Sequence, residues 1–139
     1  LKETFIRRLH KEMLGEVWTW GGTYRTRESN LGIDPALIQV ELHKLLEDTR
    51  YWLEHETYPA DEIAIRFHHR LVHIHPFPNG NGRLSRLMAD LLIAAQAGER
   101  FTWGQSTLDA AEARKRYLAA VRAADQNDLA PLLTIARLP

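Results

Sequence analysis

Residues 75–86 read HPFPNGNGRLSR, and this stretch decides how the segments on either side of it are joined. Gly80 and Gly82 can adopt backbone angles that other residues avoid, so the N–H groups around Asn81 can point inward as a nest for an anion. Apolar residues then follow at helical spacing: Leu84, Leu87, Met88, Leu91, Leu92 and Ala95. The nest is therefore expected at a helix N-terminus, where unpaired amides and the helix dipole favour negative charge.

Charged and titratable side chains flank this loop. Arg83 and Arg86 are three residues apart, so they share a face in the first helical turn, where two cations can clasp two phosphates of one ligand. His75 supplies a base at the other end of the loop. Taken singly, each feature has an ordinary structural explanation as a turn, a solvated helix face or a cap. Their order favours a site that handles phosphate.

The stretch resembles the signature of the Fic/Doc family, which runs His-x-Phe-x-(Asp/Glu)-Gly-Asn-Gly-Arg-x-x-Arg. The Pro-Asn-Gly-Asn-Gly run is also similar to small stand-alone bacterial Fic proteins of the mobile mystery protein B type. The resemblance implies an all-α, Fic-like helical bundle around a central helix, with a short β-hairpin flap. It also implies a nucleotidyltransferase that moves AMP from ATP to a Ser, Thr or Tyr hydroxyl of a target protein.

Roles follow from the resemblance, position by position. His75 is expected to be the general base, and a histidine pKa of about 6.5 suits that task. Phe77 is expected to be an apolar anchor that turns the loop inward. The residues expected to bind the phosphates of ATP are Gly80, Asn81, Gly82, Arg83 and Arg86.

Asn79 is the one polar departure from the signature. The family's acid at this position helps to hold Mg²⁺, and an amide oxygen can ligate the ion only without a charge. We expect weaker, more phosphate-dependent Mg²⁺ binding rather than its loss. A second hypothesis is therefore a nucleotide-binding pseudoenzyme or a toxin-antitoxin interaction module.

Length and composition fit a soluble domain. The 139 residues include eighteen basic and eighteen acidic side chains, 45% hydrophobic residues and no cysteine. This predicts a single domain over residues 1–139 and a cytoplasmic location. Neutral charge argues against a nucleic-acid partner, including a DNA-binding or scaffold role, and the absence of a long apolar run argues against a membrane-bound protein.

Apolar periodicity predicts helices over residues 3–18, 34–53, 59–74, 84–95, 106–124 and 128–135. In the first, Phe5, Leu9 and Met13 recur every fourth residue. Asp34-Pro35 is a helix start, and Ser106 with Asp109 resembles a capping box.

Residues 24–33 lack a helical pattern and are compatible with a plain surface loop. The resemblance implies that this place holds the flap, which pairs with the target by strand addition. We assign target docking to Tyr24, Arg25, Thr26 and Arg27.

Two further expectations concern partners and metals. The family's inhibitory motif, (Ser/Thr)-x-x-x-Glu-(Gly/Asn), is missing because no Glu here precedes Gly or Asn. These residues alone are therefore expected to be unrestrained, and any inhibitory helix or antitoxin-like partner is expected outside them. His69 and His73, four apart, have a spacing that zinc can use, but we interpret them as packing residues.

Overall fold

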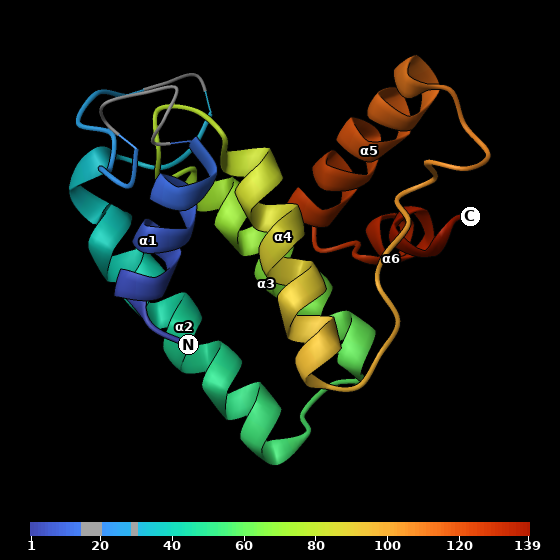
Figure 1. Cartoon of the computed structure of the whole chain (residues 1–139), viewed down its shortest axis with the longest axis horizontal. Coiled ribbons are helices and arrows are strands. Elements are labelled where there is room, and N and C mark those ends of the chain that lie inside the picture. Colours follow the sequence, from blue (N-terminus) through green and yellow to red (C-terminus); the bar gives the residue numbers. More distant parts are fainter. Residues whose placement is uncertain (15–20, 29–30) are drawn as a thin grey trace.

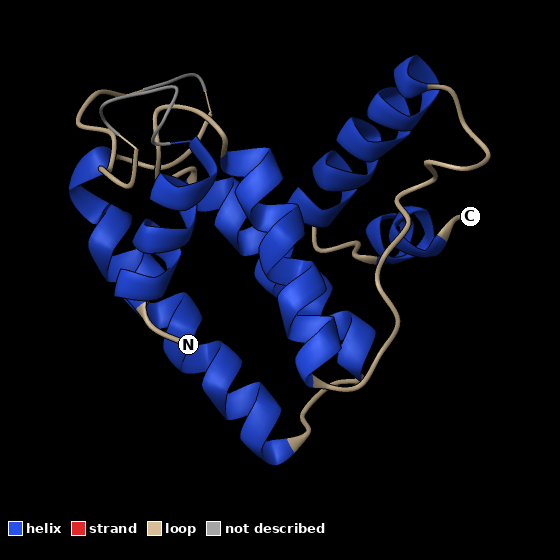
Figure 2. Ribbon diagram, viewed as in Figure 1, coloured by secondary structure: helices blue, strands red, loops and turns tan. Residues whose placement is uncertain are grey.

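The computed structural model describes residues 1–14, 21–28 and 31–139, and every element in them is helical. The expected all-α class is confirmed, and the connections between the helices are loops and turns (Figure 2). None of the described helices has the length and apolar character needed to cross a bilayer. In chain order the elements are α1 (Glu3–Leu14), the 3₁₀ helix η1 (Pro35–Leu37), α2 (Ile38–His55), α3 (Ala60–Ile74), α4 (Asn81–Ala95), α5 (Ala110–Asp125) and α6 (Ala130–Arg137).

Helices α3 and α4 lie side by side at the centre of the molecule (Figure 1). Helices α1 and α2 flank this pair on the N-terminal side, and α5 and α6 pack against each other on the other side. The loop of residues 75–80 joins the two central helices, so the packing of α3 on α4 holds both ends of that loop.

The core follows from the apolar faces of these helices. Phe67 and Leu71 of α3 and Leu84 and Met88 of α4 are at most 1% exposed and lie in one cluster with buried residues of α2 and α6. Arg137 at the end of α6 forms a two-pronged ion pair with Asp61 at the start of α3, with N–O distances of 2.6 and 2.8 Å. The last helix is thereby tied to the central pair.

The buried stripe of α1 lies one residue later than the periodicity predicted. Ile6, His10 and Leu14 are buried, whereas Phe5, Leu9 and Met13 are only partly buried at the edge of the contact. This shift of one residue rotates the centre of the buried face by about 100°, the angle between neighbouring residues on a helix. It matters because a histidine then occupies the middle of the buried face. The predicted extension of this helix to residue 18 lies outside the described residues.

Caps place the other helix starts close to their predicted positions. The side chain of Asp34 accepts from the Ala36 N–H at 3.0 Å, but the α-helix itself begins only at Ile38, after η1. The capping box predicted at Ser106 is wrong in register: Asp109 is the N-cap of α5 and accepts from the Glu112 N–H at 2.8 Å. A carboxylate is as good an N-cap as a serine, and here the helix starts at the aspartate rather than at Ser106.

No strand occurs in the described part of residues 24–33, which excludes 29 and 30. Residues 24–28 form an irregular loop beside the end of α3, with the Arg25 N–H donating to the Pro76 carbonyl at 3.0 Å. The β-hairpin flap therefore stays a prediction.

Candidate active site

His75 is the C-terminal cap of α3. Its backbone is left-handed, with φ 51° and ψ 60°, and its N–H donates to the Leu71 carbonyl at 3.0 Å. The half-buried imidazole lines a cavity of about 270 Å³ with residues 25–28 and Pro78. Burial, reinforced by the positive charge of Arg25, lowers the pKa of His75 below its usual 6.5. The ring is therefore neutral near pH 7 and can accept a proton.

Arg25 holds the end of α3 from inside the fold. It is 6% exposed, and its guanidinium donates to the carbonyls of His75 (2.6 Å), Arg27 (3.0 Å) and Ile74 (3.3 Å), and also to that of Ile33. The last carbonyls of a helix have no partner within the helix, and here a buried cation supplies one. The side chain that we assigned to target docking is thus turned inward.

Of the other three residues assigned to docking, one is turned inward and two lie on the surface. Tyr24 is partly buried, with its hydroxyl donating to Glu3 at 2.9 Å and its ring tilted against Phe77. Thr26 and Arg27 are exposed and line the cavity beside His75. The loop packs Tyr24 and Arg25 inward because both carry partners buried in the fold, and this leaves two side chains on the surface.

The turn after His75 is closed by side-chain amides. Asn81 accepts from the Phe77 N–H at 3.0 Å and donates to the Phe77 carbonyl at 2.7 Å, so both ends of its amide are occupied. Phe77 is fully buried, as its predicted anchoring role requires. The amide oxygen of Asn79 accepts from the Gly80 N–H at 2.8 Å. The Gly80 N–H and the Asn81 side chain are therefore not free for a phosphate.

Helix α4 begins inside the signature, three residues before the first predicted position. Gly80 is its N-cap with φ 78°, and no side chain in the described part of the chain caps it. The N–H groups of Asn81, Gly82 and Arg83 belong to its first turn, where an α-helix has no internal acceptor. A Cβ built on Gly82 would meet nothing within 4 Å, and Arg83 is exposed. This end of the helix is open to an anion.

Arg86 lies among aromatic rings from later in the chain. Its Cζ is 4.5 Å from the ring centre of Tyr117 and 5.9 Å from that of Trp103. The Tyr117 hydroxyl is 2.8 Å from Nε2 of the fully buried His68. Within the described chain, Nε of Arg86 and Nε1 of Trp103 are buried without a hydrogen-bond partner. Buried N–H donors without a partner are uncommon in proteins, so these two groups are candidates to donate hydrogen bonds to a bound ligand.

The model of the Fic/DOC family matches residues 1–93. The chain belongs to this family. The match includes the whole signature from His75 to Arg86, with the geometry described above. The narrower similarity to the mobile mystery protein B type stays a prediction.

Curated relatives are named protein adenylyltransferase Fic. The protein of this name from Drosophila virilis is 31% identical over 133 residues, which are 92% of this chain and 26% of that protein. The chain thus spans about a quarter of the length of the curated relatives that it matches.

Solved structures share the Fic fold. Fic-1 from C. elegans (residues 134–508 of that protein) has a TM-score of 0.82 at 25% identity, over 99% of this chain and 40% of that chain. The N-terminal Fic domain of a VirB-translocated Bep effector protein from Bartonella quintana, with bound ADP, has a TM-score of 0.74 at 20% identity, over 98% of this chain and 71% of that chain.

Sequence reasoning missed one member of this Fic site, His10, and for another, His68, it predicted a place near the loop but not the partner. His10 lies against the signature loop, and its signal was its spacing of four from Ile6 and Leu14. His68 lies under Tyr117, and no local pattern could have predicted this contact because 49 residues separate the two. His69, considered above for zinc, is 2.7 Å from a carboxylate oxygen of Asp125.

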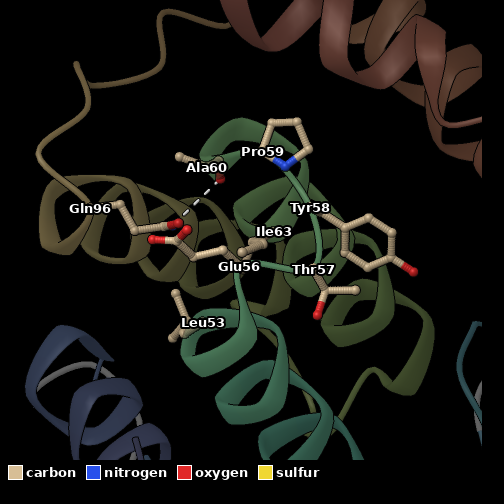
Figure 3. Close-up of a pocket in the computed structure, with 8 residues that line it drawn as sticks. All are labelled: Leu53, Glu56, Thr57, Tyr58, Pro59, Ala60, Ile63 and Gln96. Atoms are coloured by element: carbon tan, nitrogen blue, oxygen red, sulfur yellow. Dashed lines mark hydrogen bonds between the residues drawn. The ribbon is translucent and has the colours of Figure 1, made fainter.

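A separate pocket of about 620 Å³ lies at the turn between α2 and α3 (Figure 3). It is lined by Leu53, Glu56, Thr57, Tyr58, Pro59, Ala60, Ile63 and Gln96. This is the opposite end of α3 from His75, and a helix of 15 residues is about 22 Å long. The lining contains a carboxylate and no cation, so the pocket does not suit ATP phosphates.

Proposed function

We propose that the chain transfers AMP from ATP to a Ser, Thr or Tyr hydroxyl of a target protein. The observation that carries this is the position of His75, a neutral imidazole that lines a cavity and is joined by one short loop to an uncapped helix N-terminus. The name of the curated relatives, protein adenylyltransferase, and the ADP bound to the Bartonella quintana domain support the choice of an adenine nucleotide.

His75 acts as the general base in this proposal. It takes the proton from the acceptor hydroxyl while the oxygen forms a bond to the α-phosphorus of ATP. The bond between the α-phosphorus and its bridging oxygen breaks, and pyrophosphate leaves with that oxygen. The products are an AMP ester on the target, pyrophosphate and the protonated imidazole, which releases its proton to solvent.

The start of α4 binds the phosphates. We assign this role to the N–H groups of Asn81, Gly82 and Arg83 and to the guanidinium groups of Arg83 and Arg86. Gly80 contributes its left-handed backbone rather than its N–H, which Asn79 occupies. Such transfer depends mainly on positioning and on neutralising charge, which these groups supply.

The loop offers Mg²⁺ only a weak protein ligand. Asn79 offers a neutral amide oxygen, one lone pair of which already accepts from Gly80, and the described residues contain no cluster of three potential metal ligands. When bound, the ion would neutralise phosphate charge, with Asn79 as its protein ligand and the phosphates and water as the rest. This weak metal ligand favours the alternative hypothesis, a pseudoenzyme that binds nucleotide without turnover.

The target docks beside residues 26–28. Thr26 and Arg27, with Glu28, are exposed side chains at the cavity, and the backbone of this loop, which is in neither helix nor strand, can pair with a target segment. We place any inhibitory helix or antitoxin-like partner outside residues 1–139, since no Glu here is followed by Gly or Asn.

Intact-mass analysis after incubation with ATP and Mg²⁺, with and without candidate target proteins, tests the proposal. Addition of one AMP per modified protein is expected, and loss of the base in His75→Ala should slow it by about 10²- to 10⁴-fold. His73→Ala is the matched control, because this exposed histidine lies on the same helix two residues earlier. ATP binding without any AMP transfer would favour the pseudoenzyme.

A further inference from the structure

His10 of α1 connects two loops that lie far apart in the sequence. It is fully buried, and its Nε2 lies 2.8 Å from the carbonyl oxygen of Asn79 in the signature loop. On its other side, the Gly22 N–H donates to Nδ1 at 2.9 Å. The ring also stacks on Phe77, with centroids 3.8 Å apart and planes inclined by 11°.

These contacts require one form of the imidazole. Gly22 presents an N–H, so Nδ1 must carry a lone pair, and Asn79 presents a carbonyl, so Nε2 must carry the proton. A charged imidazolium could not accept from Gly22. Burial lowers the pKa of His10 below 6.5, although the Asn79 carbonyl opposes this, and the neutral ring is the form that fits.

The atom that His10 holds lies between the two halves of the candidate site. Asn79 follows His75 by four residues and directly precedes Gly80, the N-cap of α4. Gly80 is pressed against the same helix, because a Cβ there would meet Leu14 at 2.1 Å and His10 at 3.3 Å. The distance between His75 and the proposed phosphate-binding amides of α4 therefore depends on how α1 positions the peptide group between Asn79 and Gly80.

We propose that His10 is a positioning residue, which sets the distance between His75 and the first turn of α4 through its hydrogen bond to the Asn79 carbonyl. This rests on the proposed function, since it concerns the same loop. His10 does not touch the nucleotide. The bond to Gly22 orients the ring, and the bond to Asn79 is the one that acts on catalysis.

Two amide substitutions separate these bonds. In His10→Gln the amide nitrogen can take the place of Nε2 and donate to Asn79, whereas the Gly22 bond is lost. In His10→Asn the amide oxygen can take the place of Nδ1 and accept from Gly22, but the side chain is too short to reach Asn79. His10→Phe keeps the stacked ring and loses both bonds, and His43→Asn, at an exposed histidine of α2, is the control.

We expect kcat for AMP transfer to fall about 10- to 100-fold in His10→Asn and His10→Phe, since a displacement of about 1 Å can have this effect. His10→Gln should retain kcat within about threefold. Thermal unfolding checks that each variant is folded. A purely structural role would instead lower stability in both amide variants and leave their kcat values alike, and that result overturns the proposal.

Amide NMR of Gly80, Asn81 and Gly82 gives a second measurement that does not need activity. The wild type and His10→Gln should share these resonances and their response to added ATP, and His10→Asn should differ. If the wild type transfers no AMP, the proposed function fails, and the NMR comparison alone decides the role of His10. Identical loop resonances in all variants would refute it.

Discussion

Arg25 donates a hydrogen bond from Nε to the backbone carbonyl oxygen of His75 over 2.6 Å, although the two residues are 50 positions apart. The same guanidinium binds the Ile74 carbonyl and is buried among residues of the loop that precedes η1. The base is thus held by a cation whose charge also opposes its protonation. Arg25 therefore influences both the position of His75 and its pKa.

The pH dependence of AMP transfer should reflect this arrangement. Burial and Arg25 lower the pKa of His75, so the neutral base persists below pH 6.5 and activity is lost only as the pH falls through that lowered value. We expect the acid limb of kcat/KM to have its midpoint below pH 6.5. A profile measured between pH 4 and 8 checks this, and a midpoint above 6.5 would contradict it.

Gly80 and Gly82 should respond differently to alanine. Gly80 has φ 78°, and its Cβ would lie 2.1 Å from Leu14, so Gly80→Ala should lower the free energy of unfolding by about 1–3 kcal/mol. Gly82 lies in a helical turn with open space around it, so Gly82→Ala should leave stability unchanged or raise it. Urea unfolding of both variants is the measurement, and equal losses would show that the loop does not need the left-handed residue.

Buried His68 should make the fold sensitive to acid. Burial lowers its pKa to about 4, assisted by the charges of Arg86 and His69 and opposed by the Ser85 carbonyl. The unfolded chain takes up a proton near pH 6.5 and the folded one only near pH 4, so stability falls as the pH drops between these values. The loss is roughly 3 kcal/mol from this residue. Urea unfolding across this range measures it, and an NMR titration that finds His68 protonated at pH 6 would refute it.

The hydroxyl of Tyr117 should matter for ATP. Tyr117→Phe keeps the ring beside Arg86 and removes the contact with His68, so Arg86 is less firmly held. We expect the KM for ATP to rise about 3- to 10-fold, which corresponds to one ordinary hydrogen bond. Tyr51→Phe, at a tyrosine that is 56% exposed, is the control and should leave KM unchanged. An unchanged KM in Tyr117→Phe would separate Tyr117 from nucleotide binding.

Restoring the family's acid at position 79 tests whether this residue binds Mg²⁺. Asn79→Asp replaces a neutral oxygen with a charged one, so half-maximal activity should need less Mg²⁺. A Mg²⁺ titration of both proteins at fixed ATP makes the comparison. If the two curves coincide, residue 79 does not ligate the ion.

Much of the candidate site could be predicted because its parts are consecutive. The signature from His75 to Arg86 is one short turn and the first turn of a helix, and local rules for glycine, proline and helix termini relate such neighbours. The all-α class also followed from local periodicity. What local rules could not settle is which hydrogen-bonding groups are already occupied, as the Gly80 N–H and the Asn81 amide are.

The sequence by itself determined the helical class and the order of the groups in the signature loop, from which we predicted phosphate binding and His75 as the base. Only the tertiary structure decided that Arg25 faces inward, that His10 is buried against Asn79, and that His68 and Tyr117 lie beneath Arg86. The physical reason is sequence separation: these contacts join residues 49 to 69 positions apart, and whether such side chains meet depends on how whole helices pack. Periodicity places a residue on a face of its helix, but only packing determines what that face meets.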